Sequence, residues 1–429
     1  MNPLAKELNE TLKGSLIAEL LSDYGKRMYF PRGIISQSAE AKQKAHLYNA
    51  TIGIATENGK AMGIKSVYSG FEKSLERDDV LPYAPTAGDP KLRKKWLEQM
   101  ILKNPSMSGK LTSLPAVTSG LTHSISVVGA LFLDKGESII IPDMYWGNYN
   151  LVFTEQREAK QVAFPLFDGD KLNIAGLADT IDSIDSDKVS MILNFPNNPA
   201  GYTPTIDEAN ELVKMLVAKA EEGKKLLVFT DDAYFGLFFE EDTCRQSLFA
   251  LLCDAHENIL AIKGDAATKE DMVWGFRVGF ITYNSKGTTE KQYEAIVNKT
   301  MGAIRGTVSS CSKPAQTILL NGMNSPTYQQ EKEDGIKEIA KRYHLMKEVL
   351  ASYSENKLLR PLPFNSGYFM TFDCAGDSEK LRLHLLDKYG VGTISIKNQY
   401  LRLAFSSIDL DQIEDLVKIV FQGASEVFA

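Results

Sequence analysis

The sequence predicts an α/β fold, with a mainly parallel sheet sandwiched by helices in a large domain and a smaller α+β domain beside it. Short apolar runs that end at turn signals alternate with segments of helical length and periodicity, such as 122–133 and 205–222. This alternation is typical of βαβ units, whose strands are parallel. The runs are rich in β-branched or aromatic residues and have the length of buried strands, at 138–142, 189–193, 226–230 and 259–262.

The length of the chain, 429 residues, predicts two domains because a single hydrophobic core rarely grows so large. A Pro/Ser/Gly-rich patch at 321–326 precedes a long charged helical pattern at 329–352 and is a natural boundary. We expect 65–325 to form the large domain and 326–429 the small C-terminal domain, with the N-terminal segment 1–64 contributing to the small domain.

Composition narrows the classes of function. The 48 Lys and Arg against 55 Asp and Glu give a formal charge of −7, which argues against a nucleic-acid-binding surface. The longest apolar stretches are only strand-sized, so we expect no membrane span. The four cysteines include no CxxC pair and the five histidines no HExxH pattern, so we expect no metal site and a cytoplasmic protein.

Ligands of an open parallel sheet bind beyond the carboxyl ends of its strands, so the residues after each apolar run are candidate site residues. Gly120 would allow a tight turn before a helix that starts near Thr122, whose free N–H groups and dipole suit a phosphate. A capping threonine after a glycine turn would look the same. Asn198, in a loop of two prolines and three asparagines at 194–201, could donate to a phenolate oxygen, although an ordinary turn is the alternative.

Three further candidates carry charge. Asp231 ends a strand, where a carboxylate could pair with a protonated ring nitrogen or could simply cap a helix. Lys269 lies on a turn among small residues and could act as a Schiff-base nucleophile once desolvation lowers its pKa. Arg277, eight residues later, could hold a phosphate with its planar donor fork. A surface lysine and a structural arginine are the alternatives.

The order and spacing of these motifs resemble the class I aminotransferases of the pyridoxal-phosphate fold-type I group, over nearly the whole chain from Asn49 to Phe405. The matching pieces are the Asn-Asn-Pro-Ala-Gly run around Asn198, the Asp231-x-Ala-Tyr234 run, and Lys269 with Arg277 eight residues on. The last pair is the most specific. The resemblance implies a large domain with a sheet of the seven-stranded type, and pyridoxal 5′-phosphate as the cofactor.

By this resemblance, Lys269 is the catalytic residue: it carries the cofactor as a Schiff base and moves a proton between the substrate Cα and the cofactor carbon. Asp231 would pair with the pyridine nitrogen, and Asn198 and Tyr234 would hydrogen-bond the ring oxygen. Trp146 falls where the family stacks an aromatic side chain on the ring, unless it is a core tryptophan. The phosphate would be held by Ser119, Gly120, Leu121, Thr122 and Arg277.

The resemblance also implies substrate contacts and a homodimer with a shared active site. Arg402, in an apolar strand, matches the arginine that binds the substrate α-carboxylate, and burying it without a partner would be costly. Gly53 belongs to a loop that loosely resembles the substrate-covering loop, and Tyr83 and Ser309 would approach the phosphate of the neighbouring subunit. Arg305 matches the arginine that dicarboxylate-specific members use, but arginine also occurs there in relatives that accept aromatic substrates, and Arg305 could be a helix-surface cation.

Two positions depart from the family pattern. Ala266 stands where a serine or threonine often contacts the phosphate, a contact that Thr268 or Ser119 could replace. Ala200 replaces the usual threonine of the Asn-Pro-Thr-Gly motif, a change that we expect to be tolerated.

The expected function is transfer of an amino group from an L-amino acid (aspartate, glutamate or an aromatic one) to a 2-oxo acid such as 2-oxoglutarate. Another reaction on the same scaffold, such as β-elimination or decarboxylation, would keep the same cofactor residues. A ligand-sensing regulator would need a basic DNA-binding module, for which we expect no room before Met28 or after Phe405. A dehydrogenase is disfavoured because no GxGxxG follows a first strand.

Overall fold

The computed structural model describes the chain except for residues 16, 17, 19, 20, 30–32, 73, 74 and 429. Its centre is a seven-stranded sheet in the order β4-β12-β11-β10-β9-β5-β6. Neighbouring strands are parallel except for β12, which is antiparallel to both β11 and β4. The strands are β4 (Ala116–Thr118), β5 (Ser138–Pro142), β6 (Lys160–Phe164), β9 (Lys188–Asn194), β10 (Lys225–Asp231), β11 (Ile259–Ala266) and β12 (Gly279–Asn284). The predicted α/β class, mainly parallel sheet and four strands are confirmed.

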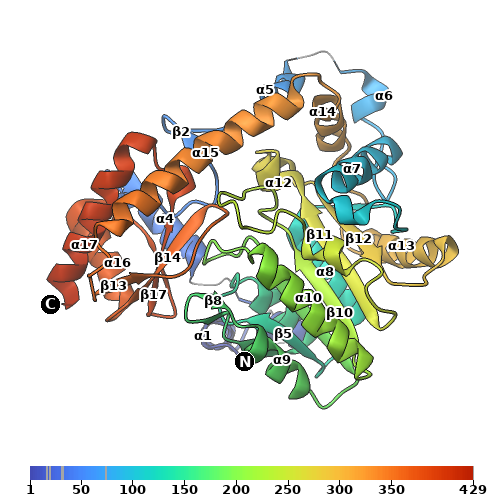
Figure 1. Ribbon diagram of the computed structural model, residues 1–429, viewed down its shortest axis with the longest axis horizontal. Helices are drawn as coiled ribbons and strands as arrows, with labels where there is room; N and C mark the ends of the chain where they lie inside the picture. Colours follow the sequence, from blue (N-terminus) through green and yellow to red (C-terminus); the bar gives the residue numbers. More distant parts are fainter. Residues whose placement is uncertain (16–17, 19–20, 30–32, 73–74, 429) are drawn as a thin grey trace.

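Helices cover both faces of this sheet, because its strands alternate apolar residues between two hydrophobic clusters (Figure 1). Leu227 and Phe229 of β10 pack on the face covered by α8 and α13, whereas Leu226 and Val228 pack on the opposite face. The helices of this part are α7 (Pro90–Lys103), α8 (Leu121–Phe132), α9 (Ile174–Asp182), α10 (Ile206–Glu221), α11 (Leu248–Leu252), α12 (Ala267–Glu270), α13 (Glu290–Arg305) and α14 (Lys313–Met323). We call the two sides the α8 face and the α7 face.

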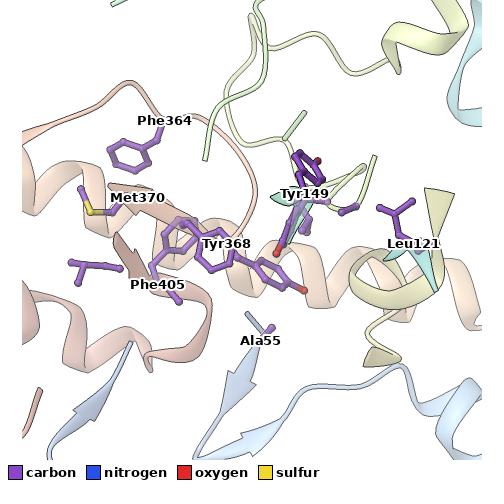
Figure 2. Packing of buried hydrophobic residues seen from close by; sticks show 14 of the residues in the cluster. Ala55, Leu121, Tyr149, Phe364, Tyr368, Met370 and Phe405 are labelled. Carbon is purple, nitrogen blue, oxygen red and sulfur yellow. The ribbon is translucent and has the colours of Figure 1, made fainter. Parts of the chain in front are cut away.

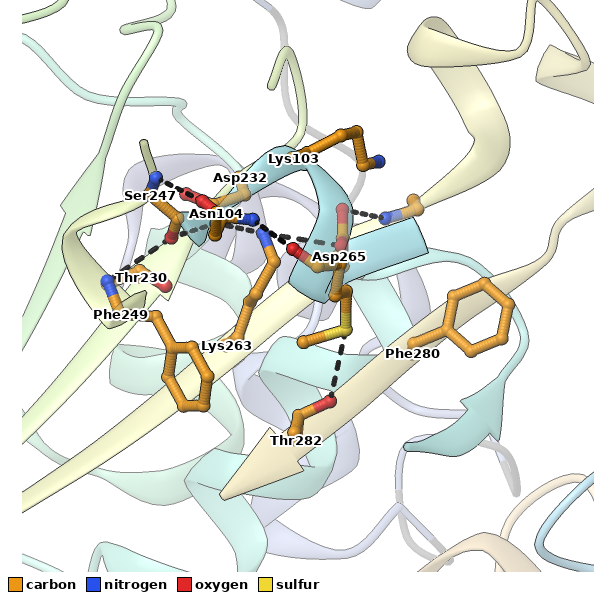
Figure 3. A network of polar contacts seen from close by, with 12 residues as sticks. Lys103, Asn104, Thr230, Asp232, Ser247, Phe249, Lys263, Asp265, Phe280 and Thr282 are labelled. Atoms are coloured by element: carbon orange, nitrogen blue, oxygen red, sulfur yellow. Dashed lines mark hydrogen bonds and ion pairs between the residues drawn. The ribbon is translucent and has the colours of Figure 1, made fainter. Parts of the chain in front are cut away.

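Buried charges lie on the α7 face as well as apolar residues (Figure 3). Lys263 of β11 is fully buried and contacts the carboxylates of Asp232 and, at 3.2 Å, Asp265. Ser247 donates a hydrogen bond of 2.6 Å to Asp232, and the Trp96 indole N–H donates one of 3.2 Å to Asp265. A buried ammonium group between two carboxylates is stable only with such partners.

A second, four-stranded antiparallel sheet in the order β13-β14-β17-β16 lies beside the first. The long helix α15 leads from α14 and α5 across to α17 of this smaller part (Figure 1). Its elements are β13 (Leu359–Pro361), β14 (Phe369–Cys374), β15 (Val391–Gly392), β16 (Ile394–Ile396), β17 (Tyr400–Ala404), α15 (Tyr328–Ala351), α16 (Ser378–Tyr389) and α17 (Ile413–Phe428).

The N-terminal segment meets the C-terminal one through β1, which pairs in parallel with β15. Our domain boundaries at 64 and 325 stay a prediction. The elements of this segment and the remaining short ones are α1 (Pro3–Leu12), α3 (Asp23–Arg27), α4 (Ile34–Lys44), β1 (Tyr48–Asn49), β2 (Thr56–Glu57), β3 (Lys60–Ala61), α5 (Lys65–Tyr68), α6 (Arg77–Val80), β7 (Phe167–Asp168) and β8 (Lys171–Leu172).

One hydrophobic cluster joins the α8 face to the smaller sheet. Figure 2 shows Leu121 and Tyr149 at one end of it and Met370 and Phe405 at the other, with Tyr368 between them. Close packing of this kind fixes how the two sheets lie relative to each other. Among the described helices, none is both long and apolar enough to cross a membrane.

Gly201 gives the fold a testable close contact. Its φ of +78° is left-handed, and an added Cβ would overlap the carbonyl oxygen of Phe369 in β14. We expect Gly201→Ala to lower the free energy of unfolding by about 2–5 kcal/mol, because the left-handed backbone costs about 1–2 kcal/mol and the overlap adds about 1–3 kcal/mol. Thermal and denaturant unfolding would measure this loss.

The matched control is Gly223→Ala. Gly223 has a φ of +99°, but an added Cβ there would meet no described atom outside its own segment within 4 Å. This variant should lose only the backbone contribution of about 1–2 kcal/mol. Equal losses in the two variants would show that the approach to Phe369 is unimportant.

Candidate active site

A cavity of about 170 Å³ opens at the carboxyl ends of β9, β10 and β11, beside the first turn of α8. Its position agrees with the rule that ligands of parallel sheets bind at this edge. The cavity is lined by Leu121, Thr122, Trp146, Asn194, Asn198, Asp231, Ala233, Tyr234, Thr268, Lys269 and Arg277.

Lys269 brings its amine into the cavity from α12, directly after β11. Its Nζ atom lies 4.6 Å from the centroid of the Tyr234 ring. Burial lowers the pKa of Lys269 to about 8, with the Asp231 carboxylate opposing this shift and the Arg277 guanidinium adding to it. A lysine with a pKa of about 8 is neutral far more often at physiological pH than an exposed lysine. The neutral amine is the form that acts as a nucleophile.

Asp231 also lines the cavity and is 3% exposed. Its Oδ2 atom accepts a 2.5 Å hydrogen bond from the Tyr149 hydroxyl, and its Oδ1 atom accepts one of 3.1 Å from the Ala233 N–H. Burial raises the pKa of Asp231, while these hydrogen bonds and the nearby Lys269 cation favour the ionised form. The carboxylate is therefore held rigidly, ready to pair with a protonated group in the cavity.

The site also contains an anion-binding cradle. Gly120 has a φ of +76° and stands directly before α8. Because glycine has no side chain, Gly120 does not cap the first N–H groups of this helix. An added Cβ at Gly120 would overlap the Arg277 guanidinium, so glycine is needed for arginine and helix terminus to meet. Free helix N–H groups beside a guanidinium bind a phosphate well.

Arg402 is the middle residue of β17, and its side chain reaches the loop that carries Asn198. It is 2% exposed; its Nη1 donates a 2.9 Å hydrogen bond to the Asn198 side-chain oxygen, and its Nη2 donates one of 3.1 Å to the Thr51 carbonyl. Within the described chain its Nε has no hydrogen-bond partner, and the guanidinium lies 4.1 Å from the centroid of the Phe369 ring. Burial lowers the pKa of Arg402 to about 10. A buried cation with a donor to spare is suited to an anion such as a carboxylate.

The structure brings together most of the predicted site residues. Leu121, Thr122, Trp146, Asn198, Asp231, Tyr234, Lys269 and Arg277 line one cavity. Gly120 lies against the guanidinium of Arg277, which lines the cavity. Gly53 lies close to another lining residue, since a Cβ added to it would be 3.7 Å from the Tyr234 hydroxyl. Thr268 also lines the cavity, which makes it the better of our two candidates to replace the missing contact at Ala266.

Seven predicted residues do not line the cavity: Gly53, Gly120 and Arg402, described above, and Ser119, Tyr83, Arg305 and Ser309. Ser119 donates its N–H to His123 Nδ1 at 3.1 Å. Tyr83 is 93% exposed, and Arg305 donates a 2.9 Å hydrogen bond to the Ser309 hydroxyl on the surface. The roles that we predict for Tyr83 and Ser309 need a second subunit, and these roles and that of Arg305 stay predictions.

Sequence reasoning missed three residues of the site. Tyr149 binds Asp231 across 82 positions of sequence, and Asn194 donates a 2.8 Å hydrogen bond to the Asp231 carbonyl oxygen. Ala233 lines the cavity and donates its N–H to Asp231. The position of Asn194 at the end of a predicted strand was the one available signal. Nothing local distinguished Tyr149 from a core tyrosine.

The assembled residues fit pyridoxal 5′-phosphate. The cradle of Gly120, Arg277 and the α8 terminus suits its phosphate, buried Asp231 suits its ring nitrogen, and the Lys269 amine suits its aldehyde. The described residues contain no group of His, Cys, Asp and Glu side chains placed to hold a metal ion.

Comparisons with known proteins agree with this chemistry. The sequence pattern of the family "aminotransferase class I and II" matches residues 55–420. A probable aspartate/prephenate aminotransferase from Aquifex aeolicus is 23% identical over 278 residues, which are 62% of this chain and 65% of that protein. The match therefore spans less than two thirds of the length of that relative.

Solved structures show the same fold. An aminotransferase from Anaerococcus prevotii superposes with a TM-score of 0.84 at 23% identity, covering 94% of this chain and 99% of that one. The Pyrococcus horikoshii kynurenine aminotransferase, solved in complex with PMP, has a TM-score of 0.79 at 18% identity and covers 98% of this chain and 100% of that one. These likenesses confirm the fold-type I architecture, and the chain belongs to the class I and II aminotransferase family, whose cofactor is pyridoxal 5′-phosphate.

Proposed function

We propose that this protein is an aminotransferase that moves an amino group from an L-amino acid to a 2-oxo acid such as 2-oxoglutarate. The observation that carries the proposal is that the Lys269 amine, with a pKa lowered to about 8, shares one cavity with buried Asp231 and the Arg277 cradle. The names of the relatives, an aspartate/prephenate and a kynurenine aminotransferase, support aspartate, glutamate or an aromatic amino acid as donor.

The side chains divide the work of binding and proton transfer. When bound, pyridoxal phosphate supplies an electron-withdrawing ring that stabilises negative charge at the substrate Cα. Asp231 holds the proton on the ring nitrogen, and its hydrogen bonds from Tyr149 and Ala233 keep it oriented. Lys269 would act as the base that moves the proton of the substrate Cα, as its position in the cavity and its lowered pKa permit.

The remaining residues hold the two ligands. Asn198 and Tyr234 face the cavity and can hydrogen-bond the ring oxygen, and Trp146 can stack on the ring. Arg402 binds the substrate α-carboxylate, which would supply the anion that this buried guanidinium lacks among its described neighbours. Gly53 leaves room beside Tyr234 for the substrate.

We further infer a homodimer with a shared active site and a cytoplasmic location. Phe71, Leu81 and Tyr83 are 68%, 75% and 93% exposed, which is unusual for large apolar side chains and favours a covering partner. Across such an interface Tyr83 and Ser309 would approach the partner's phosphate. The cytoplasm is supported by the four cysteines, all of which are free thiols.

Purified protein should carry pyridoxal phosphate with an absorption band in the near-ultraviolet to visible range, and borohydride should attach the cofactor irreversibly to Lys269. Lys269→Ala should lower kcat about a thousandfold or more, because proton transfer by a positioned base typically contributes about 10²–10⁴-fold. Lys299→Ala, an exposed lysine on α13, is the control. Undiminished turnover in Lys269→Ala would contradict the proposed role.

In cofactor-free protein, Lys269 should titrate near pH 8, because burial penalises its cation. About a tenth of the amine would then be neutral at pH 7. Asp231→Asn should lower the midpoint further, since the carboxylate stabilises the cation. The rate of acetylation of the Lys269 peptide against pH, followed by mass spectrometry, measures the midpoint. A value near the ordinary 10.5 would contradict the buried environment.

An amino-donor screen with 2-oxoglutarate as acceptor should identify the substrate. If the preferred donor is acidic, Arg305→Ala should lower kcat/KM for aspartate or glutamate about 10- to 150-fold, because a charge-assisted hydrogen bond contributes about 1.5–3 kcal/mol. Aromatic donors should change only a few-fold, and Lys299→Ala should spare both. Product release without any 2-oxo acid acceptor would point to elimination or decarboxylation instead of amino transfer.

A further inference from the structure

Two carboxylates follow Lys269 directly, and both are paired with lysines from distant parts of the chain. Lys332 Nζ lies 2.7 Å from Glu270 Oε1 and 3.1 Å from Asp271 Oδ1. Lys103 Nζ lies 2.7 Å from the same Glu270 oxygen. The Tyr328 hydroxyl donates a hydrogen bond to Asp271. We call these five residues, Lys103, Glu270, Asp271, Tyr328 and Lys332, the Lys332 cluster.

The Lys332 cluster is buried and neutral overall. The side chains of Glu270, Asp271 and Lys332 are 2%, 0% and 8% exposed, and that of Lys103 is 23% exposed. Two ammonium groups thus balance two carboxylates. In the described chain, the second oxygen of each carboxylate has no hydrogen-bond partner. The two lysines therefore carry most of the compensation that keeps these charges stable inside the protein.

The cluster also joins three elements at the residue next to Lys269. Lys103 ends α7, Glu270 ends α12, and Tyr328 and Lys332 lie one turn apart at the start of α15. From there α15 runs to α17 of the smaller part (Figure 1). On its other side, the Lys269 carbonyl accepts a 3.4 Å hydrogen bond from the Tyr368 hydroxyl. The backbone of Lys269 is consequently held from both parts of the molecule.

We propose that the Lys332 cluster positions Lys269 for its reaction, by tying the α12 segment to the first turn of α15 and by keeping the buried charge beside the catalytic amine balanced. The proposal rests on the proposed function of Lys269. Lys332 and Glu270 act through the placement and electrostatic surroundings of Lys269 and are positioning residues.

This role predicts that two substitutions in the Lys332 cluster shift the pKa of Lys269 in opposite directions. Lys332→Met leaves one carboxylate uncompensated, which should stabilise the Lys269 cation and raise the pKa of Lys269. Glu270→Gln leaves a surplus ammonium charge and should lower that pKa. A unit charge at about 10 Å, at an effective dielectric constant of about 20, moves a pKa by about 1. Asp231, Tyr234 and Arg277, which face Lys269 in the cavity, are the same in both variants.

The experiment uses the full-length protein after removal of its cofactor, so that its outcome is independent of turnover. The acetylation rate of the Lys269 peptide is measured by mass spectrometry from about pH 6 to about pH 11. The matched controls are Lys337→Met and Glu338→Gln, which remove exposed charges of the same types on α15. We expect the midpoint to rise in Lys332→Met, fall in Glu270→Gln and stay unchanged in both controls.

Removing one partner of a buried ion pair can unfold a protein, so circular dichroism of each variant accompanies the titration. Lys103→Met removes the other, partly exposed, ammonium group and should raise the midpoint like Lys332→Met. Lys332→Arg restores the charge and should return the midpoint towards wild type. Unchanged midpoints in folded Lys103→Met and Glu270→Gln, or shifts of the same sign, would overturn the proposal. Absence of amino transfer with the opposite shifts intact would overturn the proposed function alone.

Discussion

The register of β9, β10 and β11 is the constraint on which the site depends. Asn194, Asp231 and Gly264 are paired neighbours across these three parallel strands, so β9 and β10 end level with each other and β11 continues two residues further. The loops that follow can then deliver Asn198 and Lys269 to one cavity. A slip of one residue in β10 would turn Asp231 to the α7 face. The same slip would move Leu226 and Val228 from the α7 face, where they are buried, to the α8 face. The apolar alternation of the strands therefore also places the Asp231 carboxylate.

The same period of two explains why charges are separated by the sheet. Asp231 follows Leu227 and Phe229 on the α8 face, and its neighbour Asp232 pairs with Lys263 on the α7 face. On α12, which follows β11, Lys269 faces the cavity while the next residue, Glu270, pairs with Lys103 and Lys332. Asp231 and Lys269 are thus each followed in sequence by a charge that is neutralised away from the cavity. This arrangement lets the cavity hold both groups without leaving other buried charges unpaired.

Much of the fold could be predicted because the signals are local. Apolar runs and their turn residues located the strands, and the residues after them included Asp231 and Lys269. The burial of Lys263 and Lys332 could not be predicted in this way, since lysines are usually exposed and their partners lie 31 and 62 positions away. Tyr149 is a similar case, because its contact with Asp231 forms only when the sheet does. The roles predicted for the surface residues Tyr83 and Ser309 depend on a partner subunit, which one chain does not contain.

Arg402 shows how substrate binding and the relation between the two sheets are connected. It belongs to the smaller sheet, yet its two hydrogen bonds reach the loop after β9 and the N-terminal segment at Thr51. Both acceptors are neutral oxygens, so the buried guanidinium has polar partners but no compensating carboxylate among them, and such a charge is costly to bury. A substrate carboxylate would remove this cost, and would do so only while the three segments remain together around the cation. If Arg402 binds the α-carboxylate as proposed, the binding energy would also hold the smaller sheet against the cofactor cavity.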